Sequence, residues 1–129
     1  MLLDDVIRWF HLLAAAVWIG GMITVAALVP ALRKAGVDRE QIQAAARRFG
    51  AVAWVALSVS VVTGITQVFR LDVELRAPLA VKLLLVSAAV GLAFVHQEIA
   101  RNVSPALRGA MEGVLLVLAL GILAAAVAL

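Results

Sequence analysis

The chain has 129 residues, of which 65% are hydrophobic, with a mean hydropathy of +1.10 and a formal charge of +3. Soluble domains are roughly 45–50% apolar, so this composition is that of an integral membrane protein and leaves no room for a separate soluble domain. The absence of cysteine excludes disulfides and thiolate metal sites. The charge comes from arginines between apolar stretches, which argues for membrane topology and against a nucleic-acid partner.

Apolar residues dominate four stretches of the chain, and each is long enough to cross a bilayer. In chain order they cover about 6–32, 49–69, 78–99 and 110–129. Roughly 20 residues of helix cross the ~30 Å hydrocarbon layer, and only helices or closed barrels can span it. Short alternating segments of the barrel type are absent from the sequence. We therefore predict an all-α fold, an integral membrane four-helix bundle, with residues 1–129 as a single four-span transmembrane domain.

Proline and capping residues predict where these helices begin and end. Pro30 is expected to close the first span, and Asp38 with Gln41 resembles a capping box at the start of the second helix. Pro78 suits the first turn of the third helix. Pro105 disfavours helix at the residue before it and should separate the third helix from the fourth.

Basic residues predict the orientation of the chain in the membrane. Seven lie in the links that follow the first and third spans: Arg33, Lys34, Arg39, Arg47, Arg48, Arg101 and Arg108. Four lie toward the other side: Arg8, Arg70, Arg76 and Lys82. The positive-inside rule then places both termini on the outer, periplasmic side of a multi-pass protein of the inner (plasma) membrane.

Ionisable residues within the spans are the first candidates for function, because burying them in lipid is costly. His11 lies ~9 Å and Lys82 ~10 Å from the bilayer centre, both in the outer half. His96 lies in the inner half, roughly 20 Å from His11 along the membrane normal. We therefore predict that His96 and His11 of one chain do not share a metal or haem, and that Glu112 pairs with His96, Arg101 or Arg108.

The outer-half residues suggest a cofactor site around His11. Arg8, His11 and Trp18 fall on one face of the first helix. A basic rim above an imidazole suits an anionic ligand such as a haem with its propionates, and Trp18 could form the floor. We predict cofactor binding by His11, Lys82, Arg8 and Trp18, with His11 as the metal ligand. Alternatively, Arg8 is an interfacial anchor, Lys82 extends its amine to the surface, and the neighbouring small residues are helix contacts.

Three segments carry a family resemblance that covers essentially the whole chain: "RWFHLLAAAVWIGGM…VPALR", "RRF…VVTGI" and "LAVKLLLVSAAVGLAFVHQEIAR". Together they resemble the membrane domain of the CopD copper-resistance family, which implies copper handling. The arrangement is also similar to the four-helix membrane protoporphyrinogen oxidases, whose helix-one histidine and helix-three lysine are associated with haem b. That likeness falls on His11 and Lys82, but the Leu-Pro-Arg run expected after Gly21 is missing and His96 comes late.

The residues leave haem b and copper both open as the cofactor. Cu(I) prefers thiolate, thioether and imidazole ligands, yet Met22 lies ~16 Å from His11 along the helix. A single axial histidine fits haem at least as well. The function expected is thus membrane redox chemistry or copper handling. The alternative is a small accessory subunit without a cofactor, and the expected partners are the lipid bilayer and either a homo-oligomer or a larger membrane complex.

Overall fold

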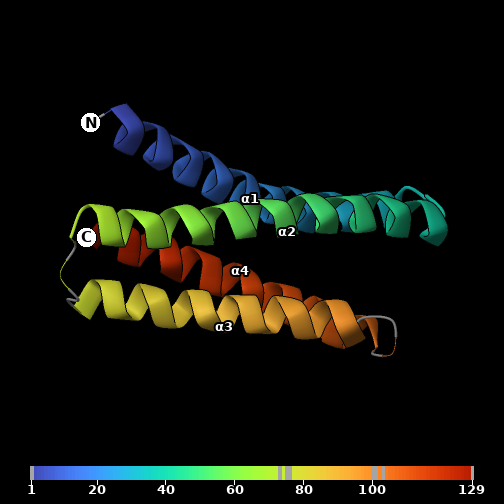
Figure 1. Cartoon of the computed structure of the whole chain (residues 1–129). Coiled ribbons are helices and arrows are strands. Elements are labelled where there is room, and N and C mark those ends of the chain that lie inside the picture. Colours follow the sequence, from blue (N-terminus) through green and yellow to red (C-terminus); the bar gives the residue numbers. More distant parts are fainter. Residues whose placement is uncertain (1, 73, 75–76, 100–101, 103, 129) are drawn as a thin grey trace. The chain divides into compact units, whose positions relative to one another are not determined.

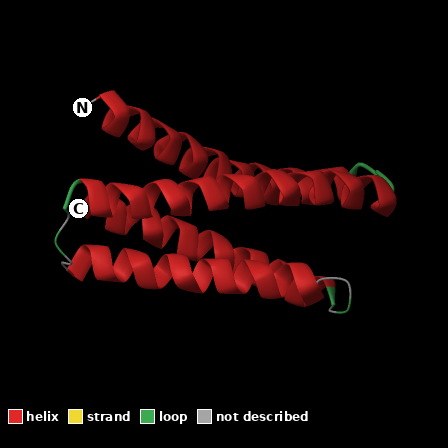
Figure 2. Cartoon of the chain, viewed as in Figure 1, coloured by secondary structure: helices red, strands yellow, loops and turns green. Residues whose placement is uncertain are grey.

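The computed structural model describes residues 2–72, 74, 77–99, 102 and 104–128. These residues form four helices, shown in Figure 1: α1 (Leu2–Lys34), α2 (Arg39–Arg70), α3 (Ala77–Ile99) and α4 (Pro105–Ala128). Figure 2 shows that every regular element among them is helical. Each helix is long and apolar enough to cross a membrane. The predicted all-α fold and the multi-pass membrane class are confirmed, and a lipid bilayer is the environment that suits these helices.

The chain divides into two compact units, Met1–Val73 and Glu74–Leu129. Within their described residues, the first unit consists of α1 packed on α2, and the second of α3 packed on α4. We call them the first hairpin and the second hairpin. The predictions that residues 1–129 form one domain and that both termini lie outside stay predictions.

The end of α1 differs from the sequence-based prediction. The helix continues through Pro30 to Lys34, so the expectation that Pro30 closes the span was wrong. It ends in a Schellman motif instead, with Gly36 at a φ of 82° and hydrogen bonds from Gly36 N to Arg33 O and from Val37 N to Leu32 O. The left-handed conformation of Gly36 lets the amides after the helix bond its last free carbonyls, which ends the helix. Pro30 removes only one amide donor, so the helix continues past it.

The start of α2 confirms the predicted position but not the predicted capping box. Asp38 is the N-cap residue of the helix, as expected. Its side chain makes no capping hydrogen bond, so the reciprocal pair with Gln41 was wrong. The helix then runs without interruption from Arg39 to Arg70.

The ends of α3 and α4 follow the proline signals. Pro78 is the second residue of α3, and α4 begins at Pro105. The Ser104 hydroxyl accepts a hydrogen bond from Leu107 N at 3.2 Å, so Ser104 caps α4 and Pro105 takes the first helical position, where no amide donor is needed.

Small residues bring the helices of each hairpin close together. In the first hairpin, the Phe49 ring lies against Gly21, so closely that a Cβ atom there would be 3.1 Å from Phe49 Cζ. In the second, a Cβ at Gly121 would lie 3.2 Å from Leu85 Cδ1. Helix association in lipid depends on such van der Waals packing, because the hydrocarbon removes the hydrophobic driving force.

The buried side chains mark the packed face of each helix. On α1 they are Ala14, Trp18 and Ile19, and on α2 they are Ile42, Ala56 and Leu57. On α4 the buried side chains recur every three or four residues, at Met111, Leu115, Ala119, Ile122 and Ala125.

Candidate functional site

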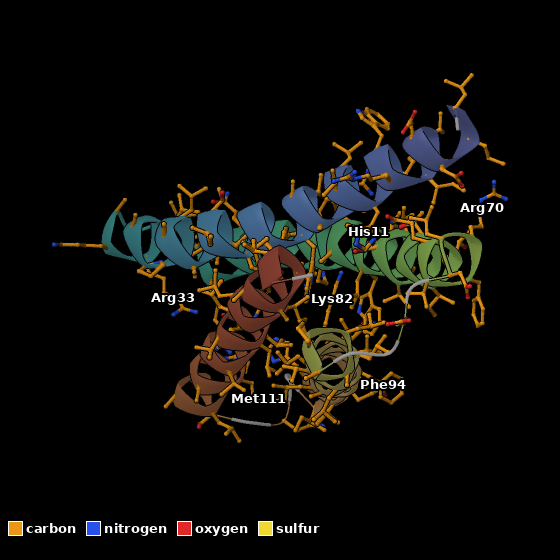
Figure 3. All side chains as sticks on the ribbon, turned by 90° about the vertical axis from the view of Figure 1, so that its left-hand side faces the viewer. His11, Arg33, Arg70, Lys82, Phe94 and Met111 are labelled. Atoms are coloured by element: carbon orange, nitrogen blue, oxygen red, sulfur yellow. The ribbon has the colours of Figure 1, made fainter. Side chains whose placement is uncertain are left out.

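His11 lies on the side of α1 that faces α2, as Figure 3 shows, and its side chain is half-buried. Its Nδ1 is 2.8 Å from the backbone carbonyl oxygen of Ser60 and 3.1 Å from Thr63 Oγ1. The imidazole is therefore held by two groups on the neighbouring helix.

The direction of these hydrogen bonds fixes the tautomer of the neutral ring. A carbonyl oxygen can only accept, so Nδ1 must carry the proton that it donates to Ser60. The Thr63 hydroxyl donates to Val59 O at 2.6 Å, which leaves its oxygen as a second acceptor for the same Nδ1–H. With the proton on Nδ1, the lone pair of the neutral ring is on Nε2.

Gly64 lets the ring approach the backbone of α2. A Cβ at this position would lie 3.0 Å from His11 Cε1 and 3.4 Å from Nδ1. Both distances are at or below ordinary van der Waals contact. A side chain larger than hydrogen at residue 64 would therefore push the ring away from the carbonyl that orients it.

Ser60, Thr63 and Gly64 are functional candidates that sequence reasoning did not assign. They stand at i, i+3 and i+4 on α2, and so on one helical face. The signal was a serine, a threonine and a glycine in the largely apolar stretch 49–69, which also contains Ser58, Thr66 and Gln67. Without knowing which residues of α2 lie opposite His11, that cluster reads equally well as ordinary helix packing.

The remaining predicted site residues fall in different surroundings. Arg8, one turn before His11, is exposed, whereas Trp18, two turns after it, is only 5% exposed in the packed face of α1. Lys82 is a half-buried residue of α3 in the second hairpin. The roles of all three toward a cofactor stay predictions, including the expectation that Lys82 shares a site with His11.

Arg70, a member of the predicted basic outer layer, is engaged by a carboxylate. Its Nε lies 2.5 Å from Asp4 Oδ1, across the end of the hairpin where α1 starts and α2 finishes. Figure 3 shows Arg70 at this end of α2. The charge of Arg70 is thereby balanced, which makes it a weaker partner for an anionic ligand than the sequence alone implied.

In the second hairpin, His96 pairs with Glu112. His96 Nε2 is 3.6 Å from Glu112 Oε1, which confirms the first of the three partners predicted for Glu112. The Nδ1 atom of His96 is buried and has no hydrogen-bond partner among the described residues. Arg101, another predicted partner, lies outside the described residues.

Within the part of the chain that the structure describes, no three His, Asp or Glu side chains come together as a group that could hold a metal ion. His11 is thus a single imidazole donor within the first hairpin.

No protein-family model, curated protein or solved structure matches this chain. The geometry around His11 is therefore the main functional evidence.

Proposed function

We propose that the chain is a CopD-like inner-membrane protein in which His11 would hold haem b, serving membrane redox chemistry or copper handling. The observation that carries this proposal is the pair of acceptors on α2, Ser60 O and Thr63 Oγ1, that hold Nδ1–H of His11. Metal-ligating histidines almost always donate their other ring N–H to a carbonyl or carboxylate, which fixes the ring and makes it a better donor.

The ligand count favours haem b over a bare copper ion. Copper sites in proteins combine several imidazole, thioether or thiolate ligands, whereas haem needs one or two axial residues. When bound, haem b would supply one-electron redox chemistry. The residues of this chain would bind and orient it: His11 through Nε2, Ser60 and Thr63 by holding the ring, and Arg8 by facing an anionic edge.

The test is the cofactor content of protein purified in mild detergent. We expect wild type to show a Soret absorption band, and His11→Ala to lose it while the helical circular dichroism is unchanged. His96→Ala, which removes the other histidine, should retain the band. Adding free imidazole to His11→Gly should restore it, because the added ring replaces the missing ligand. A His11→Ala protein with full haem would contradict the proposal, and copper found by elemental analysis in wild type but not in His11→Ala would replace haem with copper.

The same hydrogen bonds also favour a second candidate, an accessory subunit without a cofactor. In that case His11 would only tie α1 to α2 across the half-buried interface. Wild type would then carry neither haem nor copper, and His11→Ala would lower the thermal midpoint without any spectral change. Copurification with a larger membrane complex would support this alternative.

A further inference from the structure

A groove on the first hairpin is separate from the His11 contacts. It has a volume of about 450 Å³, within the range of roughly 300–1,000 Å³ that ligand sites occupy. Neither His11 nor the groups that hold it contribute to its walls. Its lining consists of Phe10, Leu13, Ala14 and Val17 from α1, and Arg48, Ala51, Val52, Val55, Ala56 and Val59 from α2.

Side-chain size gives the groove its shape. Ala14 and Ala56, each 6% exposed, are too small to fill the space between the helices. Larger side chains stand exposed around them, including Phe10 at 47% and Val55 at 66%. Phe10 is further positioned by an edge-to-face contact with Trp9, with ring centroids 5.0 Å apart. The result is an alanine floor between apolar walls.

The charge and length of the lining indicate the kind of ligand. Among the residues that line the groove, Arg48 is the charged one, and it directly precedes the apolar stretch that starts at Phe49. From Arg48 to Val59 the helix rises ~17 Å. That is close to the ~15 Å of hydrocarbon in one leaflet. A guanidinium at headgroup level above an apolar channel one leaflet deep matches a lipid with an anionic headgroup.

We propose that this groove binds one anionic phospholipid, with an acyl chain along the alanine floor and the headgroup phosphate on Arg48. Arginine suits this role because its planar fork of donors matches phosphate oxygens. The site would lie in the leaflet on the side of the α1–α2 link. Its lipids are anionic if that side is cytoplasmic, as the positive-inside rule predicts.

The neighbouring arginine offers a matched control. Arg47 is adjacent to Arg48 and carries the same charge, but it does not line the groove. General attraction of the protein to an anionic membrane surface should depend equally on both residues. Lipid binding at a defined site in the groove should depend on Arg48 and not on Arg47.

The experiment is native mass spectrometry of the full chain in detergent with added phosphatidylglycerol or phosphatidylcholine. We expect wild type to retain one phosphatidylglycerol in preference to phosphatidylcholine. Arg48→Gln should retain it about fivefold less, the effect of removing one basic contact near the surface. Arg47→Gln should behave as wild type. Ala51→Leu, which adds volume at an exposed lining position, should reduce retention of both lipids.

Several results would overturn the proposal. Equal retention of the two lipids by wild type would show ordinary boundary lipid, and equal losses in Arg47→Gln and Arg48→Gln would show general surface attraction. A wild-type dimer that Ala51→Leu dissociates, with no lipid retained, would give the groove to a second copy of the chain. Because no haem is involved in this readout, its failure leaves the His11 proposal untouched.

Discussion

The shorter of the two hydrogen bonds at His11 Nδ1 goes to the backbone carbonyl of Ser60. In an α-helix this carbonyl already bonds the amide four residues later, so the imidazole uses its second lone pair. Residue 64 supplies that amide, and because Gly64 has no side chain the carbonyl stays accessible from α1. The orientation of His11 thus depends on the absence of a side chain at Gly64 as much as on the Thr63 hydroxyl.

At the scale of single residues, we predict that Thr63 is a positioning residue for the cofactor. Thr63→Val removes one of the two acceptors of Nδ1–H but leaves the Ser60 carbonyl in place. Haem affinity should fall about tenfold, the lower end of the effect of losing a partner of a ligating histidine. The measurement is haem titration followed at the Soret band.

Two further variants separate positioning from helix packing. Thr63→Ser keeps the hydroxyl and should restore the affinity. Thr66→Val removes an exposed hydroxyl that donates within α2, to Val62 O at 2.8 Å, and should not change haem affinity. If Thr63→Val and Thr66→Val bind haem alike, Thr63 does not act through His11.

At the scale of the elements, α1 and α2 of the first hairpin contact each other in different ways along their length. The Phe49 ring covers Gly21 near the middle of α1, and the His11 ring covers Gly64 closer to the start of α1. The Asp4–Arg70 ion pair joins the helix ends beyond His11. Figure 1 shows α1 diverging from α2 toward its N-terminus, where that ion pair lies. An ion pair that uses the long Arg70 side chain suits a wider separation better than direct packing does.

At the scale of α2, we predict that two glycines respond oppositely to alanine. Gly50→Ala meets nothing within 4 Å and should stabilise the protein by up to about 1 kcal/mol through helix propensity. Gly64→Ala gains the same propensity but forces its Cβ against His11, and such overpacking costs about 1–3 kcal/mol. The difference between the two, measured by thermal or denaturant unfolding in detergent, isolates the steric cost of the His11 contact.

A double variant tests whether the cost of Gly64→Ala comes from the His11 ring. Combined with His11→Ala, which opens the space, the substitution should lose its penalty and behave like Gly50→Ala. A penalty that persists in the double variant would mean that Gly64 is needed for a reason other than the imidazole.

For the whole molecule, the membrane environment is established by helix length and composition, while its orientation is predicted by charge. Seven basic residues in the predicted inner links against four toward the other side is a modest excess. Arg47 and Arg48 lie at the boundary of an apolar stretch, where positive charge has its strongest effect on orientation. The ion pair of Arg70 with Asp4 balances part of the opposing charge.

We therefore predict that both termini face the periplasm. Alkaline phosphatase fused after the last residue should be active, because it folds only outside the cytoplasm. Green fluorescent protein inserted at Gly36, in the link between α1 and α2, should fluoresce. The reverse pattern, fluorescence at the C-terminus and phosphatase activity at Gly36, would place both termini inside.

The sequence by itself determined the helical class and the approximate bounds of the helices, and it predicted His11 as a candidate site residue. These follow from local rules: apolar length, capping residues, proline positions, and the cost of an imidazole in hydrocarbon. The prediction that Pro30 closes the first span was wrong, because a proline near a helix end removes one backbone hydrogen bond without ending the helix. The left-handed Gly36 ends it instead.

Only the tertiary structure decided what surrounds His11 and where the groove lies. Residues 11 and 60–64 are about fifty positions apart, and their contact depends on how α1 and α2 are rotated and aligned against each other. The sequence does not fix that register, because many apolar faces of similar size could pack in lipid. For the same reason the sequence could not predict the groove lined by Arg48. Its floor requires Ala14 of α1 and Ala56 of α2 to come together.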